Sequence, residues 1–433
     1  MLNRYFKLEE RGTSVRTEVL AGITTFMTMA YILAVNPSIL SACGMDSMAV
    51  FAATAISAAI STLIMGLTAN LPLSLAPGMG LNAFFAFSVV LGMGHTWQFA
   101  LTAVFLEGII FIFLTITNMR EAILNCIPPD MKKAISAGIG LFIAFIGLQS
   151  SGIVVKDKDT LVALGSMLSP DVMVAFFGIL FTGVLLSYRV RGALLLGILG
   201  STLLGIPLGV TGIANFSGEH LFAMPNLQPT FWQFEWHNIF TLEMLIILWT
   251  FLFVDLFDTV GNLIGLGAKA NLLDKDGRLP HAKNAFLADA IGTTLGAILG
   301  TSTVTTYVES ASGIAEGGRT GLTALTVAGL FTASLFLAPI FLLIPKAATA
   351  ATLIIVGLFM LSPIVHINFD DYVGALPAFL TMLLMPLTYS VATGIVWGII
   401  SHVVLSVLAG RGKEVHVLTY ALFAVFICRY ALG

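Results

Sequence analysis

Charged residues are scarce in this sequence: Asp, Glu, Lys and Arg make up 10% of its 433 residues, whereas 58% of the residues are hydrophobic. This composition excludes an ordinary soluble globular protein, whose surface needs many more charged side chains. Most of the chain instead consists of repeated apolar runs of about 20 residues, each long enough to cross roughly 30 Å of hydrocarbon. The sequence therefore predicts an all-α polytopic membrane protein in contact with the lipid bilayer.

Cysteines and basic runs are also scarce. Cys43, Cys126 and Cys428 are odd in number and far apart, so we expect neither a disulfide framework nor a metal cluster. The net charge of −3 and the lack of a basic run give no indication of a nucleic-acid partner. We expect no cleavable signal peptide, because Met1 to Glu18 contains four basic and three acidic residues and no apolar core.

An interrupted segment, residues 300–318, lies between two long apolar runs and reads GTSTVTTYVESASGIAEGG. Its Thr, Ser, Val and Tyr residues, Thr301 to Tyr307, favour extended backbone. A short helix is predicted next, with Thr305 or Thr306 as its cap and Glu309 in its first turn. About three turns are too few to cross a bilayer, and a break at that depth is tolerated where it is buried in protein or lines a cavity. Glu309 is therefore predicted to be a site residue.

Fourteen apolar spans are predicted, two of them short. They cover residues 19–41, 48–69, 79–93, 97–118, 131–149, 171–188, 192–209, 244–267, 284–300, 307–316, 320–344, 347–364, 372–388 and 390–409. A fifteenth apolar segment, residues 415–432, is left open between a further crossing, packing against the bundle and a position at the interface.

The third span is broken in the same way as the tenth. Pro77 cannot donate a hydrogen bond, and two glycines follow it before a helix expected to begin near Asn82. The first break, at Ser74, lies 55 residues after the start of the first span, and the second, at Thr301, lies 57 residues after the start of the eighth. Each half has seven spans, and because this number is odd the second half has the opposite orientation in the membrane. We therefore predict two inverted repeats whose breaks meet at mid-bilayer.

The distribution of Lys and Arg indicates the orientation of these spans. With the N-terminus in the cytoplasm, sixteen basic residues lie inside and three, Lys156, Lys158 and Lys346, lie outside. The count holds if both short segments cross the membrane. We therefore expect a multi-pass protein of the cell membrane with a cytoplasmic N-terminus.

Acidic residues inside apolar spans are costly, which makes each one a candidate functional residue. Asp255 and Asp258 in the eighth span are three residues apart and share a helix face, so one of them is expected to hold a proton. Asn262 extends the same stripe by a further turn. We predict that Asp258, Asn262 and Glu309 bind the substrate, and that Asp258, Glu309 and Asp255 couple protons. For Asp255, a structural role remains an equal alternative.

Three other polar residues in the spans have two interpretations each. Glu107 and Asp289 stand alone in their spans and are either functional-site residues or residues that make packing or gating contacts, and we expect the contacts. Asn82 either caps the half-helix of the third span or contacts a ligand across the break.

These groups indicate the chemistry of the ligand. Carboxylates accept hydrogen bonds and an amide both donates and accepts, which suits a neutral planar ligand such as a purine or pyrimidine base. An inorganic anion fits less well, because neither broken segment contains Lys or Arg. An anion transporter of the same fold and an intramembrane aspartyl hydrolase are the alternatives. A catalytic dyad would come from two facing elements, whereas Asp255 and Asp258 lie on one helix, so we do not expect an enzyme.

Several segments together resemble the AzgA-like purine permeases of the nucleobase/ascorbate transporter group. The similarity is carried by RGTSVRTEVLAGITTFMTMAYILAVNP (11–37), LAPGMGLNAFFAFSVVLGMG (75–94), AGIGLFIAFIGLQSSGIV (137–154), FVDLFDTVGNLIG (253–265), ANLLDKDGRLP (270–280) and GTSTVTTYVESASGIAEGGRTGLTA (300–324). By position, Asp258 matches the eighth-span acid that binds the base in this group, Glu309 matches its tenth-span acid and Asn82 its third-span polar residue. Asn262 stands where pyrimidine-transporting relatives have a His.

The resemblance implies a core domain, residues 19–118 and 244–344, and a gate domain, residues 131–209 and 347–409. It implies proton-coupled uptake of a purine nucleobase (hypoxanthine, guanine or adenine) by an elevator-like movement of the core, with no cofactor besides the proton gradient. It also implies a homodimer through the gate domain. An adenine-preferring permease and a xanthine/uracil-type permease remain alternatives within the same group.

Overall fold

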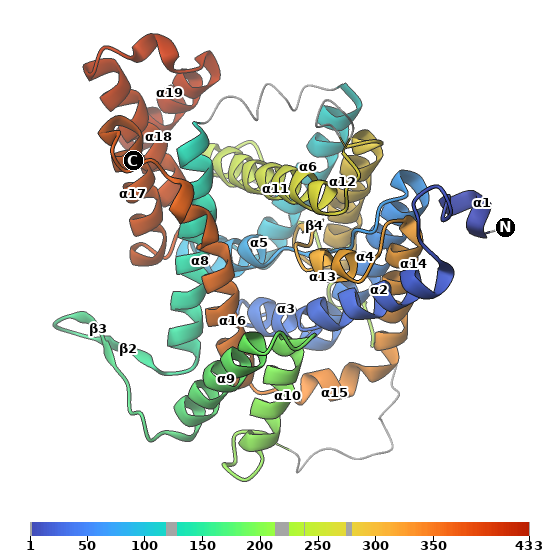
Figure 1. The fold of residues 1–433 in the computed structure, drawn as a ribbon. Helices are drawn as coiled ribbons and strands as arrows, with labels where there is room; N and C mark the ends of the chain where they lie inside the picture. The colour runs from blue at the N-terminus through green and yellow to red at the C-terminus, as the bar shows by residue number, and fades with distance from the viewer. Residues whose placement is uncertain (1, 118–127, 213–224, 238, 274–278, 433) are drawn as a thin grey trace.

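Helices make up most of the fold (Figure 1). The computed structural model describes residues 2–117, 128–212, 225–237, 239–273 and 279–432. Within these ranges, nine helices or continuous helical runs are long and apolar enough to cross a membrane, and four more are apolar but shorter. The protein is therefore a multi-pass membrane protein.

In the first half of the chain the elements are α1 (Leu2–Phe6), α2 (Val15–Met29), α3 (Ile32–Ser41), α4 (Ser47–Ile64), η1 (Met65–Ala69), β1 (Leu75–Pro77), α5 (Met79–Ala83), η2 (Phe84–Gly92), α6 (Trp97–Thr117), α8 (Pro129–Ser150), β2 (Val154–Asp157), β3 (Leu161–Leu164), α9 (Pro170–Ser187) and α10 (Ala193–Gly205). In the second half they are α11 (Leu242–Lys269), α12 (Ala282–Leu299), β4 (Val304–Thr306), α13 (Ser310–Ala315), α14 (Gly321–Ser334), η4 (Leu335–Leu337), α15 (Ala338–Leu342), α16 (Lys346–Met360), η5 (Ser362–His366), α17 (Tyr372–Leu387), α18 (Val391–Leu408), η6 (Gly412–Glu414) and α19 (Val417–Leu432).

Each predicted span coincides with one of these helices or with a run of short adjoining ones. Several begin at the residue types that stabilise a first turn: Ser14, Asp46 and Thr241 each accept a backbone N–H at the start of α2, α4 and α11. That all fourteen spans cross the membrane as two inverted sets of seven stays a prediction.

Two short strands occupy the breaks in the third and tenth spans. β1 and β4 are antiparallel, with Leu75 opposite Thr306 and Pro77 opposite Val304, and Figure 1 shows β4 near the middle of the surrounding helices. The Gly78 N–H extends the pairing by donating to the backbone O of the residue before β4 at 2.9 Å. Extended backbone was predicted at both breaks, and the structure confirms that the two breaks lie side by side.

The outer edges of this two-stranded ribbon are closed by threonine side chains. Thr62 Oγ1 on α4 lies 2.9 Å from the N and 3.1 Å from the O of Leu75. Thr293 Oγ1 on α12 lies 3.2 Å from the N and 2.9 Å from the O of Val304. Because unpaired backbone groups are costly away from water, these hydroxyls are what allow a strand at this depth. They come from the second and ninth spans, which correspond to each other in the predicted repeat.

The helix after β4 begins later than predicted. Thr305 and Thr306 were expected to cap it, but both lie in or at the end of β4 and their hydroxyls contact carboxylates of neighbouring helices. The N-cap position is instead occupied by Glu309, and α13 has six residues. The expected helix of about three turns was therefore too long, although it does end before Gly317, whose φ of +97° favours glycine.

The helix after β1 begins earlier than predicted. It starts at Met79, and the N–H of Asn82 already donates to Gly78 O at 2.8 Å inside the first turns. The capping interpretation of Asn82 was therefore wrong, because Gly78 takes the N-cap position.

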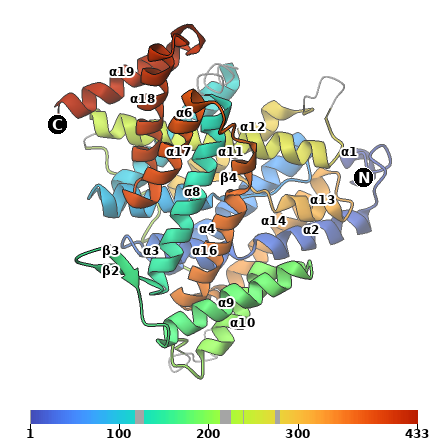
Figure 2. The ribbon, with the colours of Figure 1, turned by 60° about the vertical axis from the view of Figure 1, so that its left-hand side comes forward.

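The helices pack as two sets. In one, α2 and α4 contact α14, and α6 contacts α12; in the other, α8 contacts α16 and α17, and α9 contacts α10. Figure 2 shows α8, α16, α17 and α18 running side by side. The apolar C-terminal segment forms α19, which packs against α18 and buries Phe426. Its 16 residues are fewer than the about 20 needed for a full crossing.

Candidate substrate site

A cleft lies beside the ribbon, between the two sets of helices. It consists of two adjoining cavities of about 600 and 210 Å³ that share Gly78, Gly80, Ser136, Asp258, Asn262, Met360 and Pro363. One wall comes from α11, the two strands and the residues after them, and the other comes from α8, α16 and η5. A ligand in the cleft would therefore contact both sets of helices at once.

Asp258 and Asn262 project from successive turns of α11 into this cleft. The Asn262 Nδ2 donates to Thr306 O at 2.7 Å and to Asp258 Oδ1 at 3.3 Å, and the Thr305 hydroxyl lies 3.4 Å from Asp258 Oδ2. The strand β4 thus fixes the position of both side chains. Asn262 and Asp258 are both only partly buried and line the cavity, so the amide and the carboxylate are available to a ligand.

Glu309 reaches the smaller cavity from the N-cap of α13. Its Oε1 accepts a hydrogen bond from the hydroxyl of Tyr31, at 2.7 Å, and Tyr31 lines the same cavity. Tyr31 lies between α2 and α3 and was not among the predicted site residues, because tyrosine is not unusual in an apolar span. The structure brings Asp258, Asn262 and Glu309 together at one cavity, and their role in binding a substrate stays a prediction.

Asn82 lies apart from these three. It is fully buried on α5, where its Oδ1 accepts a hydrogen bond from the Ser302 hydroxyl and its Nδ2 lies 3.5 Å from Pro77 O. It is outside the residues that line the cleft. Its contacts hold the two breaks together, and its role as a substrate ligand stays a prediction.

Asp255 also faces away from the cleft, although it shares a helix with Asp258. It is fully buried and its Oδ1 lies 3.4 Å from the hydroxyl of Thr259, which in turn donates to Asp289 Oδ2 at 3.0 Å. Glu107, equally buried, accepts a hydrogen bond from the Thr303 hydroxyl at 2.7 Å. Three acids from α6, α11 and α12 therefore surround β4 on the side of these threonines.

The opposite wall contributes a cation that sequence reasoning missed. Lys132, at the start of α8, lines the larger cavity with its Nζ 4.9 Å from the centroid of the Phe257 ring. Lys132 lies far from both broken segments in sequence and is one of the many basic residues expected on the cytoplasmic side. Phe359 of α16 lines the smaller cavity, so aromatic faces are available on both sides of the cleft.

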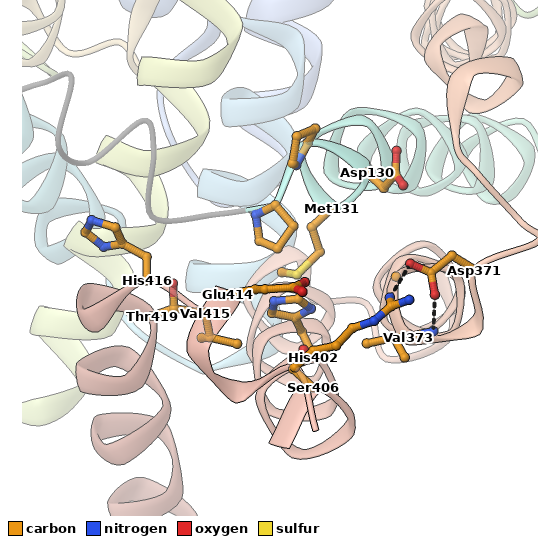
Figure 3. A pocket seen from close by; sticks show the side chains of 14 residues that line it. Asp130, Met131, Asp371, Val373, His402, Ser406, Glu414, Val415, His416 and Thr419 are labelled. Atoms are coloured by element: carbon orange, nitrogen blue, oxygen red, sulfur yellow. Dashed lines mark hydrogen bonds and ion pairs between the residues drawn. The ribbon is translucent and has the colours of Figure 1, made fainter. Parts of the chain in front are cut away.

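A separate cavity of about 340 Å³ lies between α8, α17, α18 and η6 (Figure 3). Arg411 donates to Asp371 Oδ2 at 2.7 Å there, which joins the end of α18 to the start of α17. His402 and His416 also line it. Within the described part of the chain, no group of three or more His, Cys, Asp and Glu residues is arranged to hold a metal ion.

Two interrupted helices whose strands pair beside a cleft lined by carboxylates are the arrangement of a membrane transporter. The chain belongs to the permease family Xan_ur_permease, which its residues 16–397 match. It is therefore a transporter and not an intramembrane hydrolase.

Two relatives are similar over nearly their whole length. The guanine/hypoxanthine permease PbuG of Bacillus subtilis is 46% identical over 437 residues, covering 98% of this chain and 98% of PbuG. The adenine permease AdeQ of Escherichia coli is 40% identical over 431 residues, covering 100% of this chain and 96% of AdeQ. The predicted resemblance to the AzgA-like purine permeases is thereby confirmed.

A solved structure shares the fold. The transmembrane domain of the cyanobacterial bicarbonate transporter BicA superposes with a TM-score of 0.65 at 16% identity, covering 87% of this chain and 97% of that domain. At this identity the likeness concerns the fold alone.

Proposed function

We propose that this protein imports purine nucleobases, hypoxanthine and guanine foremost, by proton symport. The observation that carries the proposal is that Asp258 and Glu309, from two different elements, line one small cavity together with Asn262. Carboxylates accept hydrogen bonds from the N–H groups of a base, and the amide of Asn262 can donate to the ring nitrogen and carbonyl oxygen atoms of that base. The similarity to PbuG, a guanine/hypoxanthine permease, and to AdeQ, an adenine permease, supports a purine as the ligand.

The proposed movement is an elevator. The core domain, residues 19–118 and 244–344, carries Asp258, Glu309 and the ribbon, and it slides along the gate domain, residues 131–209 and 347–409. In support, the two domains approach each other closely at the cleft without a side chain on Gly80 between them: a Cβ on Gly80 of α5 would lie 2.7 Å from Ile139 Cγ2 of α8. The larger cavity extends toward Lys132, at the end of α8 that the charge distribution assigns to the cytoplasm, which corresponds to an inward-open state in the cell membrane.

The same proposal includes a homodimer through the gate domain. Large apolar side chains such as Phe176 on α9 and Phe379 on α17 are about half exposed, at 47% and 48%, and face either lipid or a second copy. The mass of the detergent-solubilised protein, measured by light scattering, distinguishes one copy from two.

Uptake of labelled hypoxanthine by cells that lack purine uptake tests the function. We expect accumulation that is faster at acidic external pH, and competition by unlabelled guanine or adenine but little by uracil. Xanthine or uracil competing best would indicate the xanthine/uracil-type permease. Competition by bicarbonate or sulfate instead would favour the anion transporter, for which the cation of Lys132 and the fold of BicA are the supporting observations.

Two substitutions test the site itself. Asp258→Asn and Glu309→Gln should each abolish accumulation while leaving the protein in the membrane, because each removes a charged acceptor that faces the cavity. Asp370→Asn, an exposed acid outside the cleft, is the matched control and should transport normally. Unchanged uptake in both site variants would remove these acids from the mechanism.

A further inference from the structure

Three carboxyl groups behind β4 are left over by the proposed substrate site. Glu107 on α6, Asp255 on α11 and Asp289 on α12 are fully buried, and all lie outside the residues that line the cleft. The charged groups that act on Asp255 are Asp289, Glu107 and Asp258, which are all acids. Among the described residues, only acidic charges act on Asp255, and three buried negative charges in such surroundings are strongly unfavourable, so some of these groups must be neutral.

The hydrogen-bond donors around the cluster are too few for three carboxylates. Asp289 accepts from Thr259 at 3.0 Å and from Thr306 at 3.4 Å, and Glu107 Oε2 accepts from Thr303 at 2.7 Å. Thr259 has one hydroxyl hydrogen to give, and it is closer to Asp289 than to Asp255.

Two oxygens remain without a partner. They are Glu107 Oε1 and Asp255 Oδ2, which are buried and make no hydrogen bond within the described residues. The two carboxyl groups are neighbours, because the charge of Glu107 acts on Asp255. Two carboxylate oxygens can form a hydrogen bond when a proton lies between them, so one added proton satisfies both orphaned atoms and removes one charge.

We propose that Glu107 and Asp255 together hold the proton that is coupled to substrate, at a site separate from the carboxylates in the cleft. The proposal rests on the function proposed above. Glu107 is proposed here as the partner of Asp255. From the sequence, where Glu107 stands alone in its span, packing or gating contacts were expected for it instead.

A chain of hydroxyls joins this pair to the cleft. Asp255 lies beside Thr259, the Thr259 and Thr305 hydroxyl oxygens are 3.0 Å apart, and Thr305 lies 3.4 Å from Asp258 Oδ2. A proton that arrives at Asp258 passes to the hydroxyl of Thr305, which gives its own hydrogen to Thr259, which gives its own to Asp255. Each hydroxyl ends with one hydrogen, and the reverse sequence releases the proton. Thr305 belongs to β4 and Thr259 contacts it. Protonation of the Glu107–Asp255 pair therefore also affects the strand that positions Asn262.

Purified protein in liposomes tests this pair with the variant Glu107→Gln. If one proton accompanies each base, an imposed gradient of about one pH unit drives about tenfold accumulation of hypoxanthine in the wild type. Gln resembles the protonated acid, so Glu107→Gln should still exchange labelled for unlabelled hypoxanthine at equal pH, within about twofold of wild type, but should accumulate none above equilibrium. Asp370→Asn, which changes an exposed acid outside the cluster, should remain driven by the gradient.

The outcomes separate the two proposals. Full gradient-driven accumulation by Glu107→Gln would overturn the shared-proton pair and leave the transport function standing. Absence of any purine binding or exchange by wild type would instead overturn the proposed function. Replacing Na⁺ by choline on both sides should change nothing; loss of accumulation in choline would assign the cluster to Na⁺ and overturn the proton.

Infrared difference spectroscopy provides a test that does not depend on the folding of one variant. Wild type should show a protonated-carboxyl band that shifts in D₂O, and the band should be missing in Asp255→Asn and in Glu107→Gln. A wild-type spectrum without that band, or a band that persists in both variants, contradicts the proposal.

Discussion

The proposed role of Glu309 in substrate binding can be tested through a single neighbouring side chain, Tyr31. Tyr31→Phe removes the hydroxyl that donates to Glu309 while the ring stays in place. Because one hydrogen bond contributes about 1 kcal/mol, the KM for hypoxanthine should rise about fivefold with the protein level unchanged. Uptake kinetics in whole cells measure this.

Tyr188→Phe is the matched control for that prediction. Tyr188 is 79% exposed and lies far along the chain from the cleft, so its substitution should leave KM unchanged. Equal KM values for the wild type and Tyr31→Phe would mean that the hydroxyl does not orient Glu309 for binding.

At this scale the sequence predicts the acids better than their partners. Asp258 and Glu309 are recognisable because a carboxylate in an apolar span has a high desolvation cost and so needs a reason to be there. Tyr31 and Lys132 carry no such signal: a tyrosine is common in a span, and a lysine at the beginning of a helix is an ordinary residue at the membrane surface. Their part in the cleft follows from tertiary contacts between segments far apart in sequence.

The ribbon is the decisive element, and its edges make it testable. Thr293→Val keeps the shape of the side chain but removes the hydroxyl that accepts a hydrogen bond from the N–H of Val304 and donates one to its C=O. Leaving buried backbone groups unpaired costs about 1 to 3 kcal/mol, so the thermal midpoint in detergent should fall by several degrees. Thr332→Val, at an exposed helix position, is the control and should melt like wild type. An unchanged midpoint for Thr293→Val would show that another group replaces the hydroxyl.

The join between α17 and α18 predicts a pH dependence. The Arg411 guanidinium donates to Asp371 and holds the pKa of that carboxyl below its ordinary value. A lowered pKa in the folded state stabilises the fold above the unfolded value of about 3.9, and this contribution is lost as the pH falls through the folded value. The effect is small because both side chains are partly exposed.

Asp371→Asn removes the charge but keeps an oxygen that can cap α17. Its thermal midpoint should lie slightly below that of wild type at about pH 7, and the two should converge near about pH 3. Asp370→Asn, next to it but without an ion pair to a described residue, should show no such convergence. A gap between wild type and Asp371→Asn that widens in acid would contradict this account of the pair.

Elements were predicted more accurately than their ends. Each predicted apolar run coincides with a helix or helical run, and β-branched residues together with Pro77 predicted both strands. The starts of α5 and α13 were misplaced because a capping rule considers a few neighbouring residues, whereas Thr305 and Thr306 are held by carboxylates from α11 and α12. Such contacts belong to the assembled bundle and are not visible in a local pattern.

The proposed elevator makes a prediction for the whole molecule. Ser38 on α3 and Thr349 on α16 belong to the two sets of helices, and their hydroxyl oxygens are 3.1 Å apart. A disulfide between Ser38→Cys and Thr349→Cys would therefore join the core domain to the gate domain with little distortion. The oxidised double variant should still bind hypoxanthine but should not transport it, and a reductant should restore transport.

Each single cysteine variant is the control and should transport with or without oxidant. Undiminished transport by the fully oxidised double variant would exclude a sliding movement at this contact and would favour a fixed arrangement of the two sets with a local gate.

The pairing of β1 with β4 also has a consequence for biosynthesis. β1 is synthesised more than two hundred residues before β4. Until β4 follows, the backbone groups of β1 that pair with it have no strand partner. Neither half alone contains all the residues that line the cleft, so fragments expressed separately should bind a base only when they are produced together.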